Sequence, residues 1–425
     1  MKKTLTWSLT AVTALSLTLG ATLPASGATT SAAATSATST LTTSNGPSGK
    51  YLAPQAKVTA KNRTTLDRLL AQLPADWEAR RDRVLKGANI DTQPAREAAD
   101  AKIAAAIDPG DYICGPTQLS GYIDSILADV DPGNLFILAL FGVLDFPTYD
   151  AIFYGTPKGA DYQIPAAYQS SLTSTFGYAQ RFWDVKLNNV QLMEMHGAMV
   201  VDTSRMTRLV TLLYGLQGQE AIDFATELIG IVRSDPGLKK GNNPIFTLNA
   251  FAFSGKEETD PIFRKLPDKM VFGDGILAAL KALGLNQVGP KAVLGHEMAH
   301  HVQFEDGLFE SALTGPEATR RTELMADAFG SYFATHKKGL GLGAAQLLQV
   351  EQAFYDVGDC SFTSNGHHGT PNQRRAASSW GVAVAATAGT QLTVLPSLRL
   401  DAKFEKVLPQ LVASDAPKVP AVPAD

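Results

Sequence analysis

The chain has 425 residues, with 37 Lys and Arg against 41 Asp and Glu, so its formal net charge is −4 with His neutral. Apolar residues make up 45% of it, which is enough for a sizeable core and excludes a disordered chain, since such chains are poor in apolar residues and highly charged. The mild acidity argues against a nucleic-acid-binding protein, which would show a basic face or domain.

The N-terminus has the three-part layout of a secretory signal peptide. Two lysines precede an apolar to weakly polar stretch, and small residues follow it up to Ala28. We expect residues 1–28 to be this signal, and the mature chain to be soluble and either secreted or located in the periplasm or cell envelope. No run of about 18 apolar residues occurs elsewhere, so no membrane span is expected in the mature chain. Residues 29–56, rich in Ala, Thr and Ser, are expected to form a linker.

Residues 57–240 are predicted to form a helical N-terminal region. The apolar run 134–144 is too short to span a bilayer and indicates a buried helix or strand. Apolar residues also lie at helical spacing over 183–218, where His196 is expected to be a core or helix-face histidine rather than a ligand. Three roles fit the region: a prodomain, an accessory domain that gates substrate access, or an integral part of one fold.

The only two cysteines are Cys114 and Cys360. An even pair in an exported protein is most simply a disulfide, which would tie the N-terminal part of the chain to the C-terminal part. The alternative is that Cys114 is a thiolate held on a metal in a latent form, because thiolates are strong zinc ligands.

Residues 241–390 carry the chemistry-bearing motifs, and residues 391–425 are expected to be a C-terminal extension and tail. The aromatic, partly alternating segment 245–253 is predicted to contain a strand, and so is Lys269–Phe272. A helical pattern begins at Ile276.

The key motif is His-Glu-x-x-His, formed by His296, Glu297 and His300. Pro290 suits the first turn of a helix and Gly307 suits its end, so the motif is predicted to be helical. On a helix, positions i and i+4 face the same side, so His296 and His300 can direct ring nitrogens at one zinc ion. Glu297 lies beside them, where it can act as general base for a metal-bound water.

A catalytic zinc usually has three protein ligands, and a second helix offers the third. Glu323 and Asp327 are four residues apart in a segment predicted to be helical from about Pro316. Glu323 is expected to bind the metal. Asp327 is expected to accept the N–H of a ligand histidine and so fix its orientation.

A third segment places His368 just before a predicted helix that contains Arg374. Thr370, Pro371 and Gln373 resemble a capping box with Pro at the first helical position. His368 and Arg374 either stabilise the oxyanion of a tetrahedral intermediate, or are a loop histidine and a surface arginine.

These motifs, in content and order, resemble those of the CaaX-prenyl-protease-type zinc peptidases. The residue sequence around the histidine motifs is also similar to that of bacterial neutral zinc metallopeptidases. Both groups are zincins whose third zinc ligand is Glu. The resemblance covers about residues 245–385. It implies a strand at Asn249, Ala250 and Phe251 along which an extended peptide substrate adds as an extra strand.

We therefore expect a mainly α (α+β) fold, with a zincin-like metallopeptidase core, a small β-sheet and an additional helical N-terminal region. The expected function is that of an exported zinc metalloendopeptidase whose Zn²⁺-bound water is activated by Glu297. Its partners would be protein or peptide substrates. Two alternatives stay open: a non-catalytic extracellular binding protein on a zincin scaffold, and a purely structural metal site.

Overall fold

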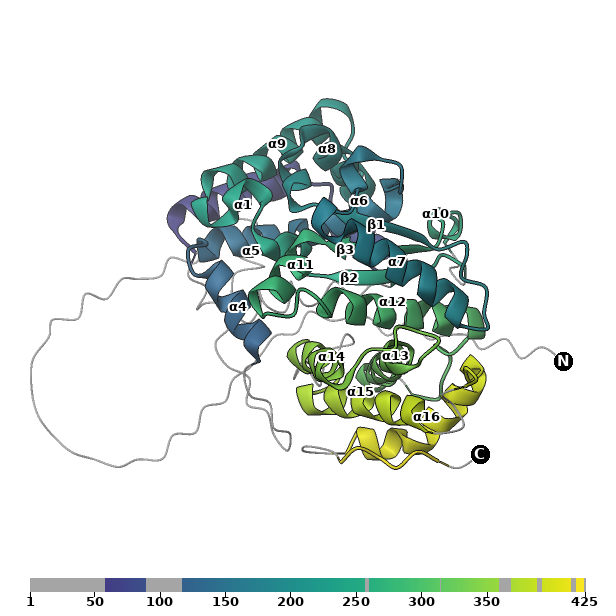
Figure 1. Ribbon diagram of the computed structural model, residues 1–425. Helices are drawn as coiled ribbons and strands as arrows, with labels where there is room; N and C mark the ends of the chain where they lie inside the picture. The colour runs from purple at the N-terminus through teal and green to yellow at the C-terminus, as the bar shows by residue number, and fades with distance from the viewer. Residues whose placement is uncertain are drawn as a thin grey trace, which may run out of the picture. The chain divides into compact units, whose positions relative to one another are not determined.

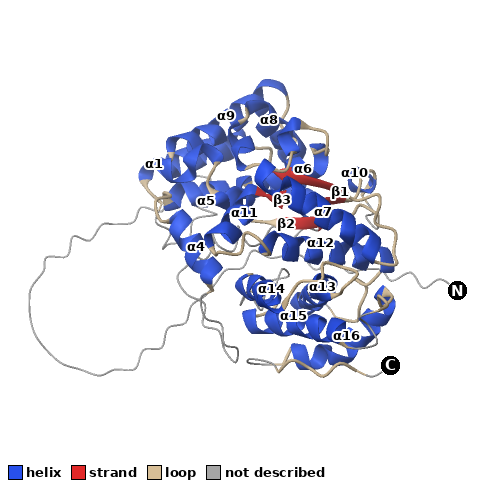
Figure 2. Ribbon diagram, viewed as in Figure 1, coloured by secondary structure: helices blue, strands red, loops and turns tan. Residues whose placement is uncertain are grey.

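A three-stranded β-sheet lies between two sets of helices (Figures 1 and 2). The structure is a computed structural model that describes residues 58–88, 117–256, 260–313, 315–358, 368–387, 392–413 and 418–423. The predicted signal peptide and linker, Cys114 and Cys360 lie outside the described residues. All described residues belong to one compact unit.

The sheet has the order β1–β3–β2, with β1 at Gln191–Met195, β2 at Ala250–Phe253 and β3 at Lys269–Gly273. Strand β1 runs parallel to β3, with Met195 opposite Gly273, and β2 runs antiparallel to it. Every residue of β3 is buried, as expected for a central strand covered on both faces.

The two faces of the sheet contribute to separate hydrophobic cores. Val271 of β3 belongs to the first core, whereas its neighbours Met270 and Phe272 belong to the second. This division follows from the period of two along a strand, because successive side chains point to opposite faces.

Helices from the N-terminal half form most of the first core. They are α1 (Ala60–Gln72), α2 (Trp77–Ala88), α4 (Gln118–Leu127), α5 (Pro132–Leu140), α6 (Phe146–Tyr154), α8 (Thr203–Tyr214) and α9 (Gly218–Ser234), with the short α10 (Pro261–Arg264). Helices of the second core are α7 (Ala166–Phe182), α11 (Asp274–Ala282), α12 (Gly289–Asp306), α13 (Pro316–Thr335), α14 (Ala344–Asp356), α15 (Pro371–Ala386) and α16 (Ser397–Leu411). Short 3₁₀ turns complete the described chain: η2 (Val143–Asp145), η3 (Ala160–Tyr162), η4 (Gly197–Val201), η5 (Pro236–Gly241) and η6 (Pro244–Thr247).

The expectation of a mainly α chain with a small sheet is confirmed. The helical prediction over 183–218 is wrong for β1, which supplies one of the three strands. Its helical-looking spacing arises because Met193, Glu194 and Met195 are all buried, so the strand lacks the polar and apolar alternation of a half-exposed one.

No single helix among the described residues has the length and hydropathy of a membrane span. One pair of helical segments, Pro132–Leu140 and Val143–Tyr154, meets the criterion only when joined, and the chain bends by 73° between them.

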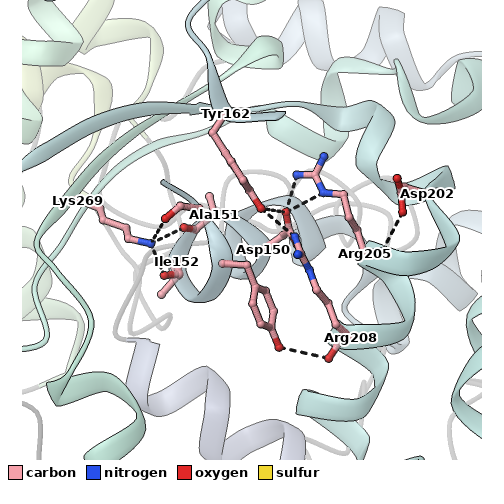
Figure 3. Close-up of polar contacts among 10 residues, drawn as sticks. Asp150, Ala151, Ile152, Tyr162, Asp202, Arg205, Arg208 and Lys269 are labelled. Atoms are coloured by element: carbon pink, nitrogen blue, oxygen red, sulfur yellow. Dashed lines mark hydrogen bonds and ion pairs between the residues drawn. The ribbon is translucent and has the colours of Figure 1, made fainter. Parts of the chain in front are cut away.

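Buried charges join α6 to the strands and helices around it (Figure 3). The fully buried Asp150 accepts hydrogen bonds from Arg205 Nε at 3.0 Å and Arg208 Nε at 2.9 Å, both on α8, and from the Tyr162 hydroxyl at 2.7 Å. On β3, Lys269 Nζ donates to the carbonyls of Ala151, Ile152 and Gly155, at 2.8, 2.5 and 2.9 Å. These carbonyls lie at the end of α6, where the last carbonyls of a helix lack intrahelical partners. The Ala151 carbonyl also accepts from Gly155 N at 3.1 Å, so the ammonium group is its second donor.

Replacing Lys269 by Met should lower the free energy of unfolding by about 3 kcal/mol, because three buried carbonyls would lose a charged donor. Urea unfolding of the purified chain measures the change. Lys281→Met on α11 is the matched control, since Lys281 is exposed and its loss should cost little. Equal stability of the two variants would contradict this role for Lys269.

Candidate metal centre

Helix α12 carries the His-Glu-x-x-His motif on its buried face. Its first turn contains Pro290, and Gly307 ends it with a left-handed φ of 69°. The predicted helix is confirmed, and both end signals act as the sequence indicated. His296 and Glu297 are 7% and 6% exposed, so the motif lies inside the fold rather than on its surface.

Helix α13 approaches α12 so closely that their backbones meet at a pair of glycines, Gly295 and Gly330. A Cβ on Gly330 would lie 2.9 Å from the backbone nitrogen of His296, and one on Gly295 would lie 3.3 Å from the Gly330 carbonyl oxygen. Helix α15 approaches α13 in the same way, since a Cβ on Gly381 would lie 2.1 Å from the Ala328 carbonyl oxygen. The three helices therefore form a tight stack in which α13 is central.

This stack brings Glu323 of α13 to the two histidines of α12. The Nε2 atoms of His296 and His300 are 3.0 Å apart. One Glu323 oxygen lies 3.3 Å from His296 Nε2, and the other lies 3.2 Å from His300 Nε2. The predicted three-residue cluster thus assembles in the fold, and it could hold a metal ion.

The remaining ring nitrogen of each histidine faces an oxygen acceptor. His300 Nδ1 lies 2.8 Å from Gln303 Oε1, and the Gln303 amide donates in turn to the Thr322 carbonyl on α13 at 2.8 Å. His296 Nδ1 lies 2.9 Å from Asp327 Oδ1, although the angle falls outside that of a regular hydrogen bond. Both contacts favour a proton on Nδ1, which leaves Nε2 to face the cluster as a ligand would.

Arg374 of α15 holds Asp327 in place. Its Nε and Nη2 atoms donate to the two Asp327 oxygens at 2.8 and 2.7 Å, a bidentate pair, and Nη2 lies 3.6 Å from Glu323. Arg374 is 3% exposed, so the surface-arginine interpretation is wrong. The predicted capping box of α15 is confirmed: Gln373 N donates to Thr370 Oγ1, and Thr370 N donates to Gln373 Oε1.

The charges in the cluster perturb one another's pKa values. Burial would lower the pKa of His296, but its contacts with Asp327 and Glu323 outweigh burial and raise it to about 9. Burial would raise the pKa of Glu323, but the neighbouring His300 and His296 hold it well below its usual range. Burial raises the pKa of Glu297, opposed by the charges of His296 and His300. The site therefore places Glu297, a carboxyl group with a raised pKa, next to Glu323, a carboxyl group with a lowered pKa.

The other predicted site residues are not among the three that form the ligand group. His368 is buried just before the N-cap of α15 and is not part of the three-residue ligand group. Ala250 and Phe251 lie on β2, which pairs only with β3 among the described strands, and α12 packs against β2. Asn249 directly precedes β2, and its carbonyl accepts a hydrogen bond from Gly273 N.

Two features of the site were not predicted from the sequence. Gln303 is fully buried and orients His300, a role that its i+3 position on the helix could have indicated. The neighbouring His301 does not face the cluster, because its Nε2 lies 3.0 Å from the Lys269 carbonyl. Burial lowers the pKa of His301 to about 3, so this histidine is neutral and links α12 to β3.

Comparisons with models of protein families, with curated proteins and with solved structures gave no match.

Replacing Asp327 by Asn should weaken metal binding by about 10- to 100-fold, because His296 would lose the carboxylate that orients its ring. Stability should also fall by about 3 kcal/mol, since Arg374 would lose a buried ionised partner. Metal titration and urea unfolding measure the two effects. Asp124→Asn, at an exposed position, is the control. Unchanged metal affinity in Asp327→Asn would remove this residue from the site.

Proposed function

We propose that the chain is a zinc metallopeptidase with a zincin-type core. The observation that carries the proposal is the convergence of His296, His300 and Glu323, from two helices, on one buried point with Glu297 beside it. Three protein ligands are typical of a catalytic zinc, which keeps one position for water or substrate, whereas structural zinc usually has four and favours Cys.

The spacing of the ligand atoms supports zinc. Bonds of about 2.0–2.1 Å in tetrahedral geometry separate neighbouring ligand atoms by about 3.3 Å. In the structure the two Nε2 atoms are 3.0 Å apart, and each has one of the two Glu323 oxygens at 3.3 Å (His296) or 3.2 Å (His300). The donor set of two imidazoles and one carboxylate is also one that zinc commonly takes.

Glu297 is the proposed general base. A bound zinc ion would polarise the scissile carbonyl and lower the pKa of a water molecule at the site. Glu297 takes a proton from the attacking water and passes it to the leaving amine, as a buried carboxylate with a raised pKa is suited to do. Asp327 and Gln303 act as positioning residues, since each faces the Nδ1 atom of a ligand histidine. Arg374 is also a positioning residue, because it binds Asp327 and lies 3.6 Å from Glu323.

Strand β2 is the proposed docking edge for the substrate. It is an edge strand of the described sheet and packs against α12, the helix that bears the cluster (Figure 2). An extended peptide pairing with β2 as an extra strand would run along α12. This arrangement favours a protein or peptide substrate. His368 is the proposed helper for the oxyanion, and export through residues 1–28 is part of the same proposal.

Replacing Glu297 by Gln should leave zinc binding intact and lower kcat/KM for casein or a peptide library by about a thousandfold, because the general base is lost while the ligands stay. Glu310→Gln, an exposed position near the end of α12, should keep full activity. Full activity in Glu297→Gln would refute the mechanism. A wild-type chain that binds zinc and cleaves nothing would favour the binding-protein alternative.

A further inference from the structure

A second cluster of ligand-type side chains lies at the carboxyl end of the parallel strands β1 and β3, and it shares no residue with the first. It consists of Glu194, His196 and Asp274, whose ligand atoms all lie within 4.8 Å of one another.

The strand register explains why these three residues meet. Met195 and Gly273 are the last paired residues of β1 and β3, so the residues that follow them, His196 and Asp274, emerge side by side. The backbone at His196 is still extended, with φ −112° and ψ 129°. Glu194 and His196, two residues apart, therefore point to the same face. In open sheets with parallel strands, this end is where ligands bind.

The environment of the Glu194 side chain indicates a ligand-binding role. It is fully buried, and no N–H or hydroxyl group among the described residues donates to either carboxyl oxygen. Its neighbour is Asp274, a second carboxyl group, so the two can hydrogen-bond only when one of them carries a proton. A buried carboxyl group without a donor costs several kcal/mol. A cation between the two carboxylates would remove that cost.

His196 is oriented as a metal ligand. Its Nε2 atom lies 3.1 Å from the Gln163 carbonyl oxygen, which accepts only from an N–H, so the proton is on Nε2. Nδ1 lies 3.0 Å from both oxygens of Asp274. One ring nitrogen bound to a backbone carbonyl and the other directed at the ligand position is the arrangement typical of metal-binding histidines.

We propose that Glu194, His196 and Asp274 bind a second divalent transition-metal ion that ties the end of β1 to the start of α11. One imidazole and two carboxylates suit Mn²⁺ or Zn²⁺. Ligand atoms at about 2.1 Å from a six-coordinate ion are about 3 Å apart when adjacent, which the contacts of His196 Nδ1 with Asp274 match. The Asp274 side chain is 43% exposed, so the ion has a route from solvent and room for water ligands.

The competing account of this cluster needs no metal. Burial and the nearby Asp274 raise the pKa of Glu194 to about 10, so the carboxyl would simply carry a proton. A contact with Asp274 raises the pKa of His196, although burial and the charge of Arg205 act to lower it. A protonated His196 would then form an ion pair with Asp274. The two accounts differ in whether the folded chain binds a cation here, which a titration decides.

The test uses the full chain carrying His300→Ala, which removes a ligand of the first cluster. Mn²⁺ and Zn²⁺ are titrated separately, and bound metal is counted by equilibrium dialysis with elemental analysis. We expect one ion per chain. Adding Glu194→Gln should weaken its binding at least tenfold, and adding Glu220→Gln, at an exposed position, should change nothing.

Asp274→Asn is the second variant, because its partly exposed side chain makes it less disruptive to the fold than Glu194→Gln. It should weaken binding by a similar factor, and circular dichroism verifies that each variant is folded. The proposal is overturned if neither ion binds to the His300→Ala chain, or if binding survives both Glu194→Gln and Asp274→Asn unchanged. Peptidase activity plays no part in this readout, so failure here and failure of the proposed function are separate outcomes.

Discussion

Helices α12 and α13 touch backbone to backbone where Gly295 faces Gly330, and this contact sets the geometry of the candidate metal centre. A Cβ on Gly330 would lie 2.9 Å from the His296 nitrogen, so any larger residue there would push the helices apart. His296 lies directly after Gly295, and Glu323 lies two turns before Gly330 on α13. The distance between the helices therefore fixes the separation between imidazole and carboxylate, which is 3.3 Å for His296. Helix α15 also packs against α13, and its Arg374 donates to Asp327, the carboxylate next to His296.

Both clusters orient their histidines by the same physical means. In each histidine one ring nitrogen lies 2.8 to 3.1 Å from an oxygen of the protein, which is Asp327 for His296, Gln303 for His300 and the Gln163 carbonyl for His196. The other nitrogen is then directed at a carboxylate. The acceptors of His296 and His196 come from other parts of the fold, so the orientation of these two rings depends on tertiary packing. Gln303 lies on the same helix as His300, but its own amide is held by the Thr322 carbonyl of α13. Such fixed rings lower the cost of arranging ligands around an ion.

Local signals in the sequence were enough to predict α12 and α15, because Pro290, Gly307 and the Thr370–Gln373 capping box determine helix ends through contacts a few residues apart. The choice of Glu323 also followed from helical spacing and the usual ligand number of zinc. Strand β1 was not predicted, because its burial on both faces removes the alternation of polar and apolar residues that marks a strand. The pairing of Glu194 and His196 with Asp274 depends on the register of β1 against β3, and no local pattern specifies the pairing of distant strands.

The central claim is that His296, His300 and Glu323 share one metal ion, and an anomalous difference map from crystals grown with zinc tests it most directly. Data collected on both sides of the zinc absorption edge locate the ion without assuming its ligands. The account predicts a strong peak about 2 Å from both histidine Nε2 atoms and from a Glu323 oxygen. A map without a peak among these three residues, in crystals where zinc is bound elsewhere, would contradict it.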